Sequence, residues 1–177
     1  MVVCDATCLE RNLNLVLQTM EISSRVLVCV NLLDEAKRKN ITINLKKLSQ
    51  KLGVPVVGTV ARSKKSLEHF LEELDALTES TTPFTPYEVK YSPVIEAAIA
   101  MAEPAVAREV EGRINSRWLT LKLLEGDPSL LKELTDYLEE DILENSQVAH
   151  SLEDSKAYLE ENGLYGEQLK DRVVAAW

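Results

Sequence analysis

Apolar and polar positions over the first 80 residues follow a pattern that predicts strands separated by helices. Three short apolar runs indicate buried strands, at residues 1–6, 25–30 and 54–60. Apolar residues recur at helical spacing over residues 8–20 and 44–53, and Ser66 is predicted to cap a further helix. Strands that alternate with helices are typical of a parallel sheet with crossover connections. The sequence therefore predicts an α/β unit with three parallel strands.

The second half of the chain shows only helical spacing. An apolar pattern runs through residues 92–126, and Pro104 is expected to kink or split it. Asp127 followed by Pro128 predicts a helix start, because Asp caps well and Pro fits the first helical position. Ser151 and Asp154 are spaced like a capping box, which predicts another helix start. With a short last helix, this half is predicted to form four or five packed helices.

Charge and proline content divide the chain at about residue 80. Residues 1–80 carry 11 basic and 10 acidic side chains, whereas residues 81–177 carry 9 and 19, for a net charge of −9. Residues 81–93 contain three prolines and are predicted to form an extended linker between residues 1–80 and a helical domain at 94–177. An acidic second half argues against nucleic acid as a partner, because phosphates would be repelled.

Cysteine and histidine placement predicts neither a metal site nor a catalytic group. Cys4, Cys8 and Cys29 have no metal-like spacing, and we expect buried, reduced thiols of a cytosolic protein. His69 and His150 are far apart, without cysteine or carboxylate neighbours at ligand spacing. The sequence contains no apolar run long enough to span a bilayer, and Met1 is not followed by a secretory signal pattern.

Two polar residues end the second predicted strand at a spacing of three. In an open parallel sheet, ligands bind beyond the carboxyl ends of the strands, where Asn31 and Asp34 are expected to lie. A carboxylate there can accept two hydrogen bonds from guanine, one from the ring N–H and one from the exocyclic amine. Adenine would leave that carboxylate unpaired, which is costly. The alternative is that these residues only cap the following helix.

The third predicted strand ends in a second turn that could share the same pocket. Ala61 is small enough to let a backbone N–H approach the guanine carbonyl oxygen. An ordinary strand-to-helix turn explains the same residues. The basic run Arg62, Lys64 and Lys65 is compatible with phosphate binding or with a solvated loop. N-x-x-D after one strand and V-A-R after the next make a more specific signal together than either does alone.

The stretches "DATCLERNLNL", "NLLDEAKRK" and "LSQKLGVPVV" resemble the cytoplasmic N-terminal region of FeoB ferrous-iron transporters. The resemblance covers essentially the whole chain and implies the C-terminal part of a Ras-like GTPase domain, followed by a helical domain. It assigns guanine recognition to Asn31, Leu32 and Asp34, and to the loop Val60, Ala61 and Arg62. Leu32 replaces the usual lysine of N-K-x-D, and its apolar stem can still pack along the purine.

The same resemblance sets limits on activity. The 177 residues contain no G-x-x-x-x-G-K-[ST] loop, so the groups that hold the phosphates and Mg²⁺ are expected upstream of Met1. GTP or GDP is then the cofactor of the intact protein, and this chain is not expected to hydrolyse GTP alone. The implied location is the cytoplasmic side of a bacterial inner membrane.

The implied partners are the transmembrane part of the same transporter and other proteins of the Feo system. The open edge of residues 2–5 also predicts self-association. The competing interpretation is a non-catalytic helical interaction module, in which the sheet is only a scaffold.

Overall fold

The three apolar runs form a parallel sheet in the computed structural model, which describes residues 1–79, 84–139 and 141–176. The strands are β1 (Val2–Asp5), β2 (Val28–Asn31) and β3 (Val56–Gly58), in the order β1-β2-β3. Val28 of β2 pairs with Val2 on one side and with Val56 on the other. The three strands therefore end at the same edge of the sheet, and the predicted α/β class is confirmed.

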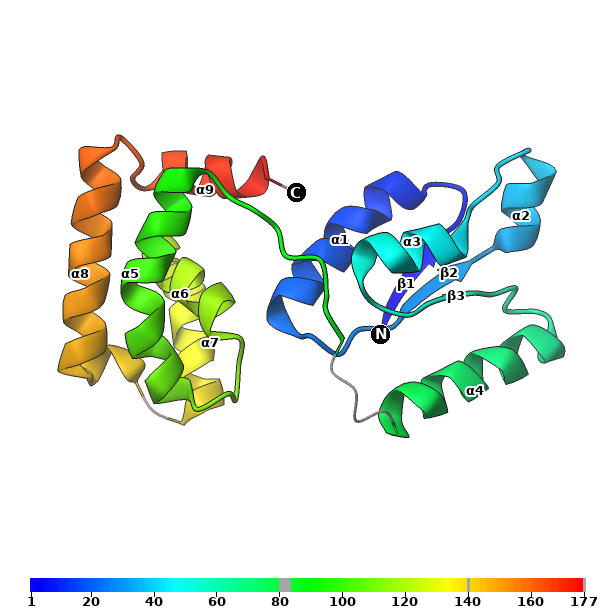
Figure 1. The fold of residues 1–177 in the computed structure, drawn as a ribbon, viewed down its shortest axis with the longest axis horizontal. Coiled ribbons are helices and arrows are strands. Elements are labelled where there is room, and N and C mark those ends of the chain that lie inside the picture. Colours follow the sequence, from blue (N-terminus) through cyan, green and yellow to red (C-terminus); the bar gives the residue numbers. More distant parts are fainter. Residues whose placement is uncertain (80–83, 140, 177) are drawn as a thin grey trace. The chain divides into compact units, whose positions relative to one another are not determined.

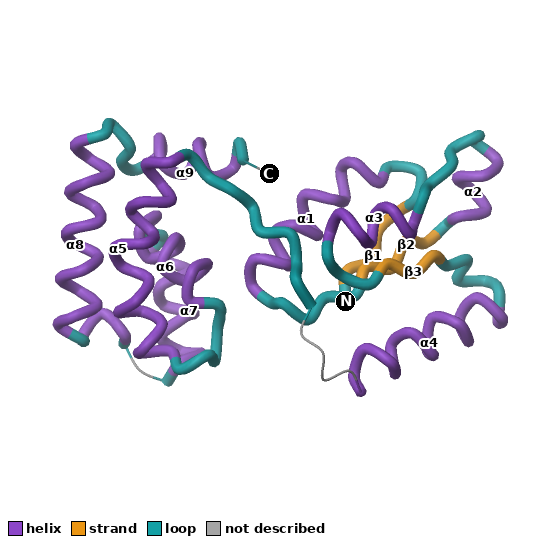
Figure 2. The backbone as a smooth tube through the Cα atoms, in the orientation of Figure 1, coloured by secondary structure: helices purple, strands orange, loops and turns teal. Residues whose placement is uncertain are grey.

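Helices cover the two faces of this sheet unequally. Helices α1 (Leu9–Ile22) and α3 (Leu45–Leu52) lie on one face, and α4 (Lys64–Glu79) lies on the other (Figure 2). The short α2 (Leu33–Arg38) follows β2 directly. Val16 and Met20 of α1 pack in one core with the strand valines. The described part of α4 buries no side chain, so its leucines cover the second face only in part.

Helix α3 has the predicted start and stop. The Asn44 side chain accepts a hydrogen bond from the Lys47 N–H at 2.9 Å, and Gly53 ends the helix with a φ of 68°. A Cβ at Gly53 would lie 1.9 Å from the Thr85 carbonyl oxygen. The Tyr87 N–H donates to the Leu52 carbonyl at 2.8 Å. Residues 85–87 therefore rest on the end of α3, within the first of two units, Met1–Glu88.

The second unit, Val89–Trp177, is helical. Its described elements are α5 (Pro93–Val110), α6 (Ser116–Glu125), α7 (Pro128–Leu138), a 3₁₀ turn η1 (Ile142–Glu144), α8 (Ser146–Glu161) and α9 (Glu167–Val174) (Figure 1). Helix α5 packs against α6 and α8. The predicted bundle of helices is confirmed, and the part of it that the structure describes contains no helix long and apolar enough to cross a membrane.

One predicted helix start in this unit is wrong, and Pro104 does not split α5. Helix α5 continues through Pro104 and ends at Val110, after which φ values of 47° at Glu111 and 79° at Gly112 turn the backbone out of the helix. Helix α8 begins at Ser146, because Asn145 accepts hydrogen bonds from the N–H groups of the first turn. Ser151 lies inside α8, where its hydroxyl donates to the Val148 carbonyl at 3.0 Å.

Candidate functional site

The loops that follow β2 and β3 are joined by backbone hydrogen bonds. The Thr59 N–H donates to the Val30 carbonyl at 2.8 Å, and the Leu33 N–H donates to the Thr59 carbonyl at 3.3 Å. These bonds continue the backbone pairing past Gly58, the last residue of β3, and past Asn31, the last residue of β2. Asn31 and the 59–61 turn are thereby held next to each other.

The Asn31 side chain ties the two loops together. Its Oδ1 accepts the Thr59 hydroxyl at 3.1 Å and the Ala61 backbone N–H at 3.2 Å. A backbone N–H can only donate, so the carboxamide oxygen must face the turn and the Nδ2 group must face away from it. The interaction brings together two of the residues predicted for the site and leaves Asn31 a donor for a ligand.

Asp34 follows a residue in an unusual backbone conformation. Leu32 has a φ of 62°, in the left-handed region, and directly precedes α2. Asp34 lies in the first turn of α2 with 27% of its side chain exposed, and its Oδ2 accepts from the Arg62 guanidinium. The left-handed residue thus separates Asn31 at the strand end from Asp34 on the helix, and Leu32 itself is partly exposed.

The turn after β3 is held by serines as well as by Asn31. The Val60 N–H donates to the Ser66 hydroxyl at 2.9 Å, and the Val60 carbonyl accepts from the Ser63 N–H at 2.7 Å. Helix α4 begins at Lys64, so Ser66 is not its cap as predicted. Ser66 acts instead as a brace for the backbone at Val60. Ala61 and Arg62 are exposed at the tip of this turn.

Thr59 is part of this arrangement and was not predicted. It is 3% exposed, and its hydroxyl lies 3.2 Å from the Cys29 sulfur as well as 3.1 Å from Asn31 Oδ1. Because the single hydroxyl hydrogen goes to Asn31, the Cys29 thiol is the donor in the other contact. The sheet register pairs Val30 with Gly58, so Thr59 stands opposite Asn31. Setting the sequences of β2 and β3 side by side in this register would have placed Thr59 next to Asn31.

The carboxyl end of β1 forms a separate loop. Asp5 accepts the Thr7 N–H at 2.7 Å, and hydrogen bonds from the backbone and side chain of Thr7 hold the pKa of the Asp5 carboxyl below its usual value. An open cleft of about 520 Å³ lies beside this loop, lined by residues 6–11 with Ile41 and Ile43. None of the six residues predicted for guanine recognition lines this cleft.

The cysteines differ in their surroundings. Cys4 and Cys29 are buried, as expected, and burial raises the pKa of the Cys4 thiol. Cys8 is exposed, so the prediction of burial is wrong there, because Cys8 immediately precedes α1 and lies outside the sheet core.

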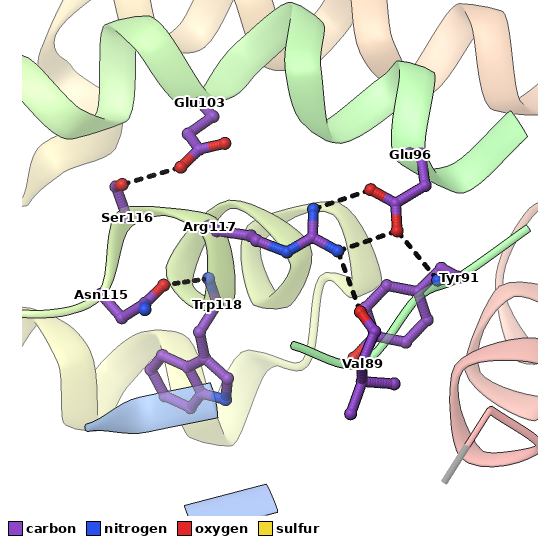
Figure 3. Close-up of polar contacts among 8 residues, drawn as sticks. All are labelled: Val89, Tyr91, Glu96, Glu103, Asn115, Ser116, Arg117 and Trp118. Carbon is purple, nitrogen blue, oxygen red and sulfur yellow. Dashed lines mark hydrogen bonds and ion pairs between the residues drawn. The ribbon is translucent and has the colours of Figure 1, made fainter. Parts of the chain in front are cut away.

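A second polar cluster fixes the start of the helical unit (Figure 3). The Arg117 guanidinium donates to both Glu96 carboxylate oxygens, at 2.8 and 2.9 Å, and to the Val89 carbonyl at 3.2 Å. It also lies over the Tyr91 ring, 5.6 Å from the ring centre, while the Tyr91 N–H donates to Glu96. Val89 and Tyr91 are buried. Burial opposes ionisation of Glu96, but these hydrogen bonds outweigh it and lower the pKa of the carboxyl.

Comparison with known proteins relates both units to one family. The family model described as "Ferrous iron transport protein B" matches residues 1–74, and the one described as "FeoB cytosolic helical domain" matches residues 91–176. The chain belongs to the FeoB family. Its match is to the cytoplasmic N-terminal region of FeoB, in agreement with the resemblance of the sequence motifs.

Individual FeoB proteins cover most of the chain. It is 31% identical over 131 residues to a Porphyromonas gingivalis FeoA–FeoB fusion protein, and 34% identical over 125 residues to Salmonella typhimurium FeoB. These alignments include 72% and 71% of this chain, but the chain spans only 16% of each relative.

Solved FeoB structures share the fold. The S. thermophilus NFeoB structure bound to GDP, AlF4⁻ and K⁺ has a TM-score of 0.70 at 27% identity, covering 98% of this chain and 64% of that one. The cytosolic domain of T. maritima FeoB in a GDP form has a TM-score of 0.66 at 27% identity, covering 90% and 63%. This likeness confirms a Ras-like partial G domain followed by a helical domain.

Proposed function

We propose that this chain supplies the guanine-reading part of the G domain, and the helical domain, of a ferrous-iron transporter of the FeoB type. The observation that carries the proposal is the pairing of the Asn31 loop with the Ala61 turn at the carboxyl edge of the sheet. Support also comes from the structural neighbours, several of which contain GDP or a related nucleotide.

The residues at this edge fit the base of a guanine nucleotide. The Asp34 carboxylate can accept the ring N–H and the exocyclic amine, and the Asn31 Nδ2 group can donate to a ring nitrogen. Leu32 offers an apolar surface for the purine face. The Ala61 N–H donates to Asn31 Oδ1 at 3.2 Å, and we propose that it shares this hydrogen with the guanine carbonyl oxygen when the base binds. The Mg²⁺ ion of the intact protein is proposed to bind outside these six residues.

In the whole transporter, we propose that the nucleotide state is relayed through the helical domain to a membrane-spanning part at the bacterial inner membrane, and so controls Fe²⁺ uptake. The Arg117–Glu96 cluster supports a relay, because it attaches the incoming chain at Val89 firmly to α5 and α6. The membrane part of the same transporter is the proposed partner, with other Feo proteins as further candidates. Copies of this chain could also associate through edge strand β1, where Val3 is exposed.

Titration with nucleosides tests the base-reading role. Guanosine should perturb the NMR amide signals of residues 31–34 and 59–62 at millimolar concentration, and adenosine should not. Asp34→Asn should remove the guanosine effect, whereas Asp75→Asn, at an exposed position on α4, should leave it unchanged. If guanosine leaves these signals unmoved, or adenosine moves them equally, the competing function as a helical interaction module is favoured.

A further inference from the structure

Asp34 is already engaged by a side chain from the neighbouring turn. Arg62 follows β3 and Asp34 follows β2, yet the Arg62 guanidinium Nη2 forms an ion pair with Asp34 Oδ2. The Arg62 side chain is 70% exposed, whereas that of Asp34 is 27% exposed. The contact therefore pairs a partly buried carboxylate that follows β2 with a side chain that is largely in solvent.

A guanidinium group and a guanine base present the same kind of edge to a carboxylate. Each offers neighbouring N–H donors that lie in one plane, and each can bind the two oxygens side by side. Asp34 has only these two oxygens to offer. Guanine that pairs with both of them needs the oxygen that now accepts from Arg62.

We propose that Arg62 is an internal competitor of guanine: it occupies Asp34 while the site is empty and must move away before the base can bind. This inference rests on the proposed function, because it assumes that Asp34 reads guanine. It changes the role of Arg62 from a guanine contact to a residue that weakens binding. In the empty site the arginine keeps a partly buried carboxylate partnered, which limits the cost of burying it.

The expected effect is modest, because the ion pair is exposed. An exposed ion pair of this kind favours the paired arrangement over the unpaired one by a factor of about two to five. Removal of the arginine should therefore tighten guanine binding by about that factor. Salt screens exposed ion pairs, whereas hydrogen bonds to a neutral base depend little on salt. Added salt should then strengthen guanosine binding to the unmodified chain.

The test is a guanosine titration of the full chain followed by NMR at residues 31–34 and 59–62. Arg62→Ala should bind guanosine about two- to fivefold more tightly than the unmodified chain. Raising NaCl from low to high concentration should reduce the difference in guanosine affinity between Arg62→Ala and the unmodified chain. Lys65→Ala removes a positive charge from the same exposed segment and should leave the affinity unchanged. Guanosine is used because it has no phosphate that a lysine could attract.

Two results would overturn the inference, and they are distinguishable. If guanosine binds in an Asp34-dependent manner but Arg62→Ala binds it equally or more weakly, Arg62 is not a competitor and the proposed function stands. If neither chain responds to guanosine at millimolar concentration, the proposed function and the inference fall together.

Discussion

The carboxamide oxygen of Asn31 lies 3.2 Å from the backbone nitrogen of Ala61 and links the two loops that follow β2 and β3. The same oxygen accepts the Thr59 hydroxyl. One side chain thus fixes the position of both segments proposed to contact guanine. The proposed guanine site depends on this link, because Ala61 and Arg62 are exposed at the tip of a turn.

Asn31→Ala should loosen the 59–61 turn. The Ala61 N–H and the buried Thr59 hydroxyl would both lose their acceptor, which should lower the free energy of unfolding by about 1–2 kcal/mol. Hydrogen exchange measured by NMR should show faster exchange at Ala61. Asn14→Ala, at an exposed position on α1, is the control and should leave the Ala61 rate unchanged. Unchanged exchange in Asn31→Ala would show that the turn is held by Ser63 and Ser66 instead.

Gly53→Ala should cost more than the same change at Gly126. Both glycines end a helix with a φ near 67°, at 68° and 66°, and alanine is strained at each. Only at Gly53 would the new Cβ meet backbone, with the Thr85 carbonyl oxygen 1.9 Å away. We expect Gly53→Ala to lower the free energy of unfolding by about 1 kcal/mol more than Gly126→Ala does. Hydrogen exchange at Tyr87 should also be faster in Gly53→Ala. Equal losses of stability in the two variants would show that residues 85–87 shift to accommodate the new Cβ without lowering the free energy of unfolding.

Glu96 should make stability depend on pH in the acid range. Its folded pKa is lowered, so its contribution is complete above the unfolded value of about 4.3 and is lost as pH falls through the folded pKa. At pH 7, Glu96→Gln should lower the free energy of unfolding by about 1 kcal/mol, because the bonds to Arg117 weaken. Urea unfolding should show this difference shrinking below pH 4.

Glu153→Gln provides the matched control for the acid range. Glu153 is exposed on α8, and its substitution should change stability by less than about 0.5 kcal/mol at pH 7. A difference between Glu96→Gln and the unmodified chain that stayed constant from pH 7 to pH 3 would contradict the assignment.

Local patterns in the sequence predicted the elements that depend on local physics. The valine-rich runs, the Asn44 cap and the Gly53 stop each involve residues close together in the chain, and the structure confirms them. Placement of Asn31 at the end of β2 followed from the same pattern. The family followed from the motif stretches and was confirmed by both family models.

Contacts between distant segments could not be predicted in this way. Thr59 braces the site through a hydrogen bond to Asn31 that exists only once β2 and β3 are aligned. The ion pair of Arg62 with Asp34 joins residues from two different loops. Helix α5 continued through Pro104 because the buried contacts along it with α6 and α8 outweigh one missing hydrogen bond.

Exchange of the base preference by Asp34→Asn is the most direct test of the guanine-reading site. An asparagine can accept from the ring N–H of xanthine and donate to the oxygen that replaces the guanine amine, whereas aspartate cannot donate. The unmodified chain should bind guanosine about tenfold more tightly than xanthosine, and Asp34→Asn should reverse that order. An unchanged order of the two affinities in Asp34→Asn would contradict the assignment of Asp34 as the residue that reads guanine.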